Sequence, residues 1–300
     1  AVDGVSFSVK KGRILGIVGE SGCGKSVTSM SILQLLGSNA RISGGSIKLD
    51  GKELIGLPEK EMCRIRGNDI AMIFQDPMTA LNPTLTIGTQ LMEPIMLHQN
   101  CGKKEAWTRA VDVLKRVGIA APEKRMKEYP HQLSGGMRQR VMIAMAVSCE
   151  PRLLIADEPT TALDVTIQAQ ILELMCELRE KMGTAIMLIT HDMGVVAETA
   201  DDVLVLYAGK AVEYGSIEDI FERPKHPYTQ GLLNSIPRLD EDVELLNTIE
   251  GTVPAPDAMP AGCRFAPRCP YGKDRCMKEK PGVYHAGNSL VSCFRYEGEK

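Results

Sequence analysis

Short runs of apolar residues alternate along this chain with longer segments in which apolar residues recur every three or four positions. The short runs predict β-strands and the longer segments predict α-helices. The predicted strands are Val5–Val9, Arg13–Val18, Ser46–Leu49, Ile70–Phe74, Leu153–Ala156, Thr184–Ile189 and Val203–Tyr207. The predicted helices are Lys25–Leu36, Ala106–Val117, Arg138–Val147 and Ile167–Lys181. Strands that alternate with helices predict an α/β fold with a mostly parallel sheet.

The character of the pattern changes twice. Residues 86–150 are helical throughout, which predicts a helical subdomain inserted into the α/β core. Residues 223–300 have poor periodicity and are rich in proline and cysteine near their end. The 50 residues 251–300 of this segment would have difficulty burying a core without a staple, a metal or a partner. We therefore expect one domain over residues 1–222 and a loop-rich extension over residues 223–300.

Composition narrows the function classes. The chain has 300 residues, a net charge of −3 and 4% aromatic residues, so it has neither a broad basic field nor a base-stacking platform for nucleic acid. No apolar run reaches the 18 residues that a membrane span needs. No signal peptide is visible, and the first residues already predict a strand, so we expect the chain to begin inside a domain. Nine cysteines, an odd number, favour a reducing compartment.

The first chemical motif follows the second predicted strand and opens a helix. It is Gly19-Glu20-Ser21-Gly22-Cys23-Gly24-Lys25-Ser26. This is the pattern of a phosphate-binding loop, in which glycines let backbone N–H groups converge on phosphate oxygens. The helix N-terminus adds positive partial charge at the same place. Lys25 would reach the β- and γ-phosphates and Ser26 would bind Mg²⁺. We interpret Cys23, in a variable position of the pattern, as a bystander.

A second motif ends the strand Leu153–Ala156 with two acidic residues. Asp157 is suited to hold Mg²⁺, and Glu158 is suited to polarise an attacking water. Asp-Glu-Pro-Thr is also ordinary helix-capping chemistry, but the phosphate loop in the same chain favours the catalytic interpretation.

A third motif lies between these two and precedes the helix Arg138–Val147. It is Leu133-Ser134-Gly135-Gly136-Met137. With it the sequence resembles the ATP-binding cassette (ABC) family, in which such a tract is the signature, although Met137 replaces the usual Gln. The remaining landmarks occur in the family's order: Gln75 resembles the Q-loop glutamine, Ala162-Leu163-Asp164 the D-loop and His191 the switch histidine.

The resemblance implies an ABC cassette, that is, a P-loop NTPase with a RecA-like core sheet and a helical signature subdomain. It implies ATP and Mg²⁺ as ligands, with Gln75 sensing Mg²⁺ beside Ser26 and Asp157, and with His191 contacting the γ-phosphate. Ser134 and Gly136 would bind the γ-phosphate held by a second cassette, identical or related. The residue that stacks on adenine in the family lies upstream of residue 1 and is not assigned.

A narrower resemblance extends through the end of the chain. His226-Pro227-Tyr228-Thr229 and the tract from Gly262 to Pro270 are similar to the C-terminal extension of the ATP-binding subunits of bacterial dipeptide and oligopeptide importers. The resemblance implies two membrane permeases, an indirect link to a substrate-binding protein, and a peripheral position on the cytoplasmic face of the inner membrane. The surface of Pro77–Pro83 is either a docking site for a permease or a bare loop.

The extension contains four clustered cysteines, Cys263, Cys269, Cys276 and Cys293. Their spacing lacks a C-x2-C pair, so they do not form an ordinary zinc ribbon. Four thiolates suit either Zn²⁺ or an iron–sulfur cluster. The family resemblance implies a 4Fe–4S cluster, and Zn²⁺ is the alternative. Arg264, Arg268 and Arg275 either offset the charge of such a cluster or are ordinary surface residues.

The function that these motifs predict is ATP hydrolysis that powers peptide import. Nickel or another solute is the alternative cargo, because the cassette does not contact what is transported. A non-transport ATPase switch is a further alternative, although the long coiled-coil insertion or second cassette that would mark one is missing from this sequence. A redox-sensing role for the cysteines is permitted by the sequence but not required by it.

Overall fold

The computed structural model describes residues 2–161, 163–236, 248–255 and 257–298. The chain divides into two compact units, which we describe one at a time. Unit 1 consists of Ala1–Ser8, Ile14–Thr28 and Ile189–Lys300, and unit 2 consists of Val9–Arg13 and Ser29–Leu188.

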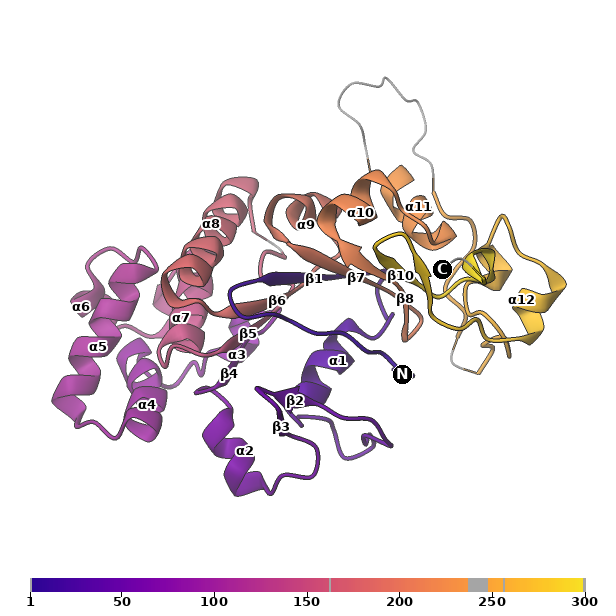
Figure 1. The fold of residues 1–300 in the computed structure, drawn as a ribbon. Coiled ribbons are helices and arrows are strands. Elements are labelled where there is room, and N and C mark those ends of the chain that lie inside the picture. Colours follow the sequence, from indigo (N-terminus) through magenta and orange to yellow (C-terminus); the bar gives the residue numbers. More distant parts are fainter. Residues whose placement is uncertain (1, 162, 237–247, 256, 299–300) are drawn as a thin grey trace. The chain divides into compact units, whose positions relative to one another are not determined.

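Unit 1 is built on a mixed group of strands (Figure 1). Strand β1 (Ile14–Val18) pairs in parallel with β7 (Asp202–Tyr207), and β7 pairs antiparallel with β8 (Lys210–Ser216). All five residues of β1 are buried, as expected of a strand covered on both faces. The turn from β7 to β8 uses Ala208 and Gly209, which both have positive φ, so the two strands form a hairpin.

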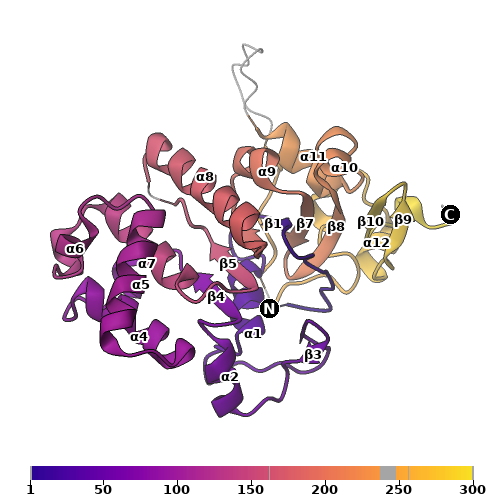
Figure 2. The same ribbon diagram turned by 60° about the vertical axis from the view of Figure 1, so that its left-hand side comes forward.

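The C-terminal extension continues this hairpin with two more strands. Strand β10 (Ser289–Val291) pairs antiparallel with β8, and β9 (Tyr284–Ala286) pairs with β10. Among the described residues, the α-helices that lie wholly in unit 1 are α9 (Met193–Thr199), α10 (Ile217–Glu222), α11 (Pro227–Asn234) and α12 (Asp274–Lys278). Figure 2 shows α12 beside β9 and β10, at the side of the strands away from β1. Helix α9 packs closely on β1 at Gly16, where a Cβ would lie 2.9 Å from Val196 Cγ1. The absence of a side chain at Gly16 therefore allows this close approach.

Unit 2 contains a parallel core and a small hairpin. Strand β4 (Ile70–Ile73) pairs in parallel with β5 (Leu153–Asp157), with Ile73 opposite Ala156, and β6 (Ala185–Ile189) follows β5 in the sheet. The hairpin consists of β2 (Lys48–Leu49) and β3 (Lys52–Glu53), joined by an Asp-Gly turn. Helix α1 (Lys25–Ile32) begins in unit 1 and ends in unit 2, which also contains α2 (Glu59–Ile65) and α8 (Val165–Met182).

The predicted helical subdomain is present in unit 2. It contains α4 (Ile87–Gln99), α5 (Lys103–Arg116), α6 (Pro122–Arg125) and α7 (Gly135–Val147), preceded by the short α3 (Pro77–Ala80). Helices α4, α5 and α7 pack against one another (Figure 1). Their buried faces are aliphatic, including Leu91, Leu114 and Ile143, so this subdomain has a core of its own.

Two predictions about secondary structure are wrong. The described residues 2–13 contain no strand, although exposure alternates through Val5–Val9 as the pattern predicted. Alternation of apolar and polar residues indicates an extended, half-buried backbone. It does not show whether a neighbouring strand is present to form the hydrogen bonds of a sheet. Helix α1 ends at Ile32 rather than at Leu36, because Gln34 adopts a left-handed conformation with φ of 51°. None of the described helices is both long enough and apolar enough to cross a lipid bilayer.

Candidate functional site

The predicted phosphate loop connects β1 to α1 in unit 1. Three of its glycines have positive φ: Gly19 (150°), Gly22 (78°) and Gly24 (106°). Gly19 is the most constrained, because a Cβ there would lie 2.1 Å from the carbonyl oxygen of Leu206 and 2.8 Å from Cys23 Sγ. The loop therefore lies directly against strand β7, in a conformation that only glycine adopts without strain.

Lys25 is buried, at 6% exposure, and its ammonium group is folded back onto the loop. Its Nζ donates to the carbonyl oxygens of Gly19 (2.7 Å) and Glu20 (3.3 Å). The positive charge is thus already held at the mouth of the loop, where a phosphate would bind. Cys23 is fully buried, and burial raises the pKa of its thiol, which agrees with its interpretation as a bystander.

His191 lies in the same unit, between β6 and α9, and its side chain is exposed. The residue before it, Thr190, donates its backbone N–H to the carbonyl oxygen of Ile17 in β1 (3.2 Å). The residue after it, Asp192, caps α9 by accepting from the backbone N–H of Gly194 (2.9 Å). Because both neighbours of His191 are hydrogen-bonded, the backbone that carries the imidazole is fixed. Its anchor point on β1, Ile17, lies two positions before Gly19, the first residue of the phosphate loop.

Unit 2 brings Gln75 and Glu158 together. Strands β4 and β5 run in parallel, so the residues that follow them emerge at the same edge of the sheet. Gln75 Nε2 donates to Glu158 Oε2 (2.9 Å), and Thr161 Oγ1 donates to the same oxygen (3.0 Å). Two donors thus orient this carboxylate, and the contribution of Thr161 was not predicted from the sequence.

The turn after β5 has the strain expected at a functional site. Glu158 has a φ of 48°, in the left-handed region that a non-glycine residue rarely occupies. Asp157, the last residue of β5, is buried at 5% exposure. The turn therefore carries a buried carboxylate at Asp157 and a half-buried one at Glu158, which suits a metal ligand beside a proton acceptor.

The signature tract forms the start of α7 in unit 2. Leu133 is buried, and the Ser134 side chain caps the helix by accepting from the backbone N–H of Met137 (3.3 Å). Ser134 and Gly135 are exposed, whereas Gly136 faces Ile167 of α8, which lies 3.3 Å from the position of a Cβ. The arrangement leaves a helix N-terminus open to solvent, as an anion-binding role requires.

One further contact connects this helix to the acidic turn. Gln139 of α7 is buried, and its Nε2 donates to the carbonyl oxygen of Pro159, next to Glu158. Asp164, the predicted D-loop residue, caps α8 by accepting from the backbone N–H of Ile167 (2.9 Å). Its predicted neighbour Ala162 lies outside the described residues. Gln139 was missed because a polar residue in an apolar helix gives no periodic signal.

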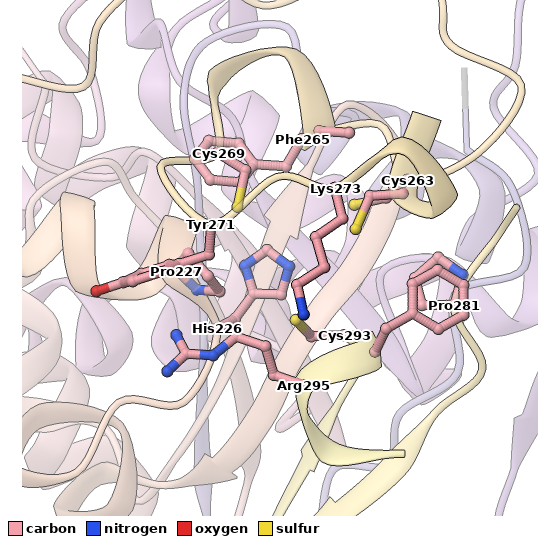
Figure 3. A pocket seen from close by; sticks show the side chains of 13 residues that line it. His226, Pro227, Cys263, Phe265, Cys269, Tyr271, Lys273, Pro281, Cys293 and Arg295 are labelled. Atoms are coloured by element: carbon pink, nitrogen blue, oxygen red, sulfur yellow. The ribbon is translucent and has the colours of Figure 1, made fainter. Parts of the chain in front are cut away.

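The four cysteines of the extension all line one cavity in unit 1, which has a volume of about 80 Å³. Figure 3 shows Cys263, Cys269 and Cys293 at this cavity, together with His226, Phe265 and Lys273. Cys276 lines it as well. A single water needs only about 10–15 Å³ by the same measure, so the space is larger than one small ligand requires.

The four cysteines of the cavity are half-buried. Burial raises the pKa of Cys263 to about 11, and burial likewise raises the pKa of Cys269 and of Cys293. Within the described residues, which include all four cysteines, no group of three or more His, Cys, Asp or Glu side chains is arranged to hold a metal ion. The structure therefore places four thiols around one space without showing the tight geometry of a single-ion site.

The charged groups around the cavity differ from those that the sequence suggested. Arg264 binds Asp3 (2.9 Å), Arg268 binds Glu20 (2.7 Å) and Arg275 binds Glu279 (2.8 Å), so these guanidinium groups have carboxylate partners. Lys273 and Arg295 line the cavity instead. Their positions depend on loop geometry, which the sequence pattern does not specify.

His226 also lines this cavity and is fully buried. Burial lowers the pKa of its imidazole to about 3, so the ring is neutral at pH 7. The neutral Nδ1 accepts the backbone N–H of Tyr228 (3.1 Å) and caps helix α11. His226 is therefore a structural residue here.

Comparison with known proteins agrees with these motifs. The ABC transporter family model matches residues 2–161 of this chain, which is more than half of its length. This chain belongs to the ABC transporter family. A second family model, described as the oligopeptide/dipeptide transporter C-terminal region, matches residues 212–276.

Relatives within the ABC family align over nearly the whole chain. The oligopeptide transport ATP-binding protein AppD of Bacillus subtilis is 57% identical over 100% of this chain and 92% of that protein. The oligopeptide transport ATP-binding protein OppD of Escherichia coli is 52% identical over 98% of this chain and 87% of that protein. Since these relatives match both the cassette and the extension, the narrower resemblance to peptide importers is confirmed.

Solved ABC structures share the fold. The ATP-binding cassette MJ0796, in a dimeric post-hydrolysis state bound to ADP and phosphate, is 29% identical with a TM-score of 0.64 over 72% of this chain and 90% of that one. CbiO1 from Clostridium perfringens, part of an ABC transporter complex, is 28% identical with the same TM-score over 74% of this chain and 84% of that one. The predicted P-loop NTPase cassette is therefore confirmed, and this chain is an ABC ATPase.

Proposed function

We propose that this chain hydrolyses ATP to power the import of dipeptides or oligopeptides through a membrane transporter. The observation that carries the proposal is the likeness to peptide-transport ATP-binding proteins over the full length of the chain, extension included. In this proposal residues 1–222 form the cassette and residues 223–300 form the extension. The substrate is a peptide, and nickel or another solute is the alternative cargo.

The test is solute uptake in the source organism after deletion of the gene. Uptake of radiolabelled dipeptides and oligopeptides is expected to fall to background and to return with a plasmid copy, while uptake of radiolabelled nickel is unchanged. Loss of nickel uptake with normal peptide uptake would favour the alternative cargo. Normal uptake of both, with a defect in DNA repair or translation, would favour a non-transport switch.

The residues of the nucleotide site have distinct proposed roles. The backbone of the loop from Gly19 to Ser26 cradles the phosphates, and Lys25 clamps them. The Ser26 hydroxyl, the Asp157 carboxylate and the Gln75 side chain would hold Mg²⁺, which supplies charge neutralisation on the phosphates. Glu158 takes the proton of the attacking water, and His191 contacts the γ-phosphate. The half-buried carboxylate of Glu158, oriented by Gln75 and Thr161, supports its role as the base.

A second ABC subunit, identical or related, completes the site in this proposal. Ser134 and Gly136 bind the γ-phosphate of the ATP on that subunit, and Leu133, Gly135 and Met137 complete the signature. The exposed helix N-terminus at Ser134 supports this role. ATP then bridges two subunits, and its hydrolysis removes the bridge, so the nucleotide shifts a two-state equilibrium. Asp164 belongs to the D-loop between the two subunits.

The membrane partners are two permease subunits, with a substrate-binding protein linked through them. The segment Pro77–Pro83, directly after Gln75, is the proposed docking site for a permease. This arrangement places the chain at the cytoplasmic face of the inner membrane.

The cysteine cavity is proposed to hold a 4Fe–4S cluster on Cys263, Cys269, Cys276 and Cys293. Four soft sulfur donors around one space support this assignment. A cluster spreads its ligands over several iron atoms, whereas a tetrahedral Zn²⁺ site needs all four sulfurs within about 2.3 Å of one ion. The cluster would supply a rigid crosslink for a segment that has few strands of its own.

Metal analysis tests this assignment. After anaerobic purification we expect about four irons and four sulfides per chain, together with visible absorption that dithionite bleaches. Changing both Cys263 and Cys293 to serine should abolish this signal, whereas Cys63→Ser, at an exposed cysteine outside the cavity, should leave it unchanged. One zinc per chain with neither iron nor sulfide would contradict the cluster assignment.

A further inference from the structure

Glu20 of the phosphate loop is held by the C-terminal extension, and all of the contacts lie within unit 1. Its carboxylate accepts two hydrogen bonds from Arg268, Nη1 to Oε2 at 2.7 Å and Nη2 to Oε1 at 3.0 Å. Its backbone N–H donates to the hydroxyl of Tyr228 at 2.9 Å. A forked pair of this kind fixes the carboxylate in distance and in orientation.

The guanidinium of Arg268 is preorganised for this contact. Its side chain is only 4% exposed. Nε donates to the carbonyl oxygen of Glu250 (2.9 Å), and Nη2 donates to that of Ile249 (3.1 Å). The guanidinium also lies 5.8 Å from the centre of the Tyr207 ring. Since the backbone of the extension holds this group in place, pairing with Glu20 costs little side-chain entropy.

Tyr228 is equally fixed, by a small aromatic cluster. Its buried ring lies 4.7 Å from that of Tyr207 and 5.3 Å from that of Phe265, measured between centroids. Phe265 and Arg268 both lie between Cys263 and Cys269 along the chain. The segment that borders the cysteine cavity therefore also anchors the phosphate loop.

The charge of Glu20 gives this anchor a consequence for nucleotide binding. A carboxylate in a phosphate loop repels the triphosphate that the loop must hold, and a partly buried repulsion is poorly screened. Arg268 cancels that charge. Glu20 also accepts Lys25 Nζ at its carbonyl oxygen (3.3 Å), so a shift of Glu20 would move the cation that faces the phosphates.

We propose that Arg268 is a positioning residue for ATP binding, which neutralises Glu20 and holds the phosphate loop in its binding form. The inference rests on the proposed function, because it assumes that ATP binds at Gly19–Ser26. It assigns to the extension a part in nucleotide affinity that is separate from any role of the cysteines.

The test is a double-mutant cycle on the full chain, read out as steady-state ATPase kinetics and as binding of a fluorescent ATP analogue. Arg268→Met leaves Glu20 unpaired and should raise KM for ATP about tenfold, with kcat changed by less than about twofold. Glu20→Gln removes the carboxylate charge that Arg268 neutralises, and its KM is the second single-variant value that the cycle needs. The double variant should return KM to within about threefold of wild type.

The KM of the double variant for ATP distinguishes charge neutralisation by Arg268 from a general packing role of this residue. If Arg268 acts only by holding the extension together, removing Glu20 as well cannot rescue binding, and a double variant as weak as Arg268→Met overturns the proposal. Arg268→Lys keeps the charge but not the fork, and an intermediate KM is expected. It also serves as the second variant should Arg268→Met not fold.

Arg275→Met is the matched control. Arg275 lies in the same extension and pairs with Glu279 (2.8 Å) and Glu297 (3.1 Å) without contacting the phosphate loop. Its loss should leave KM unchanged, and an increase as large as that of Arg268→Met would overturn the proposal. Wild-type protein without ATPase activity would refute the proposed function instead, whereas an active wild type with unchanged KM in Arg268→Met refutes this inference alone.

Discussion

Replacing Glu158 with glutamine is expected to lower kcat for ATP hydrolysis at least about 100-fold. The amide retains an oxygen that accepts from Gln75 and Thr161, so the turn after β5 keeps its hydrogen bonds. The glutamine amide cannot take a proton from water, so the substitution slows the chemical step and lowers kcat, whereas KM for ATP changes little. Phosphate release measured against ATP concentration gives both parameters.

The control for this variant is Glu177→Gln. Glu177 lies on α8 in the same unit and forms an exposed ion pair with Lys181 (2.6 Å), so turnover should be unchanged. In the presence of Mg²⁺ and ATP, the Glu158→Gln chain should also accumulate as a dimer with its proposed partner subunit, detected by light scattering. Full turnover in Glu158→Gln would show that another group activates the water.

Replacing Gly19 with alanine is expected to abolish ATP binding and to destabilise the chain by at least about 3 kcal/mol. The new methyl group would lie 2.1 Å from the carbonyl oxygen of Leu206, a backbone atom of β7 that cannot move without disturbing the sheet. The φ of 150° at this position adds conformational strain to the overlap. Urea denaturation and binding of a fluorescent ATP analogue measure the two effects.

Gly22→Ala in the same loop is the matched control for stability. Gly22 also has positive φ, at 78°, but nothing lies within 4 Å of a Cβ there. Its cost is therefore the conformational strain alone, about 1–2 kcal/mol. Equal destabilisation by the two substitutions would show that the contact with Leu206 does not constrain the loop.

Sequence patterns predicted those parts of the site that are built from neighbouring residues. The loop from Gly19 to Ser26, the acidic pair Asp157 and Glu158, and the cap at Ser134 each combine a strand or helix end with its polar residues in one short tract. Local sterics and capping mainly set the conformation of such tracts. They can therefore be predicted without knowing which distant segments pack against them. Val5–Val9 shows the limit of this reasoning, because a strand also needs a neighbour.

The sequence by itself determined the cassette fold, the order of its motifs and the cluster of cysteines. Only the tertiary structure decided that Gln75 and Thr161 share one oxygen of Glu158, that four cysteines line one cavity, and that Arg268 pairs with a loop residue 248 positions away. The physical reason is that the periodicity of apolar residues predicts which face of a helix or strand is buried. It does not predict which charged or aromatic side chain from a distant part of the chain packs against that face. Those partners are selected by packing and by the cost of leaving a buried charge unpaired.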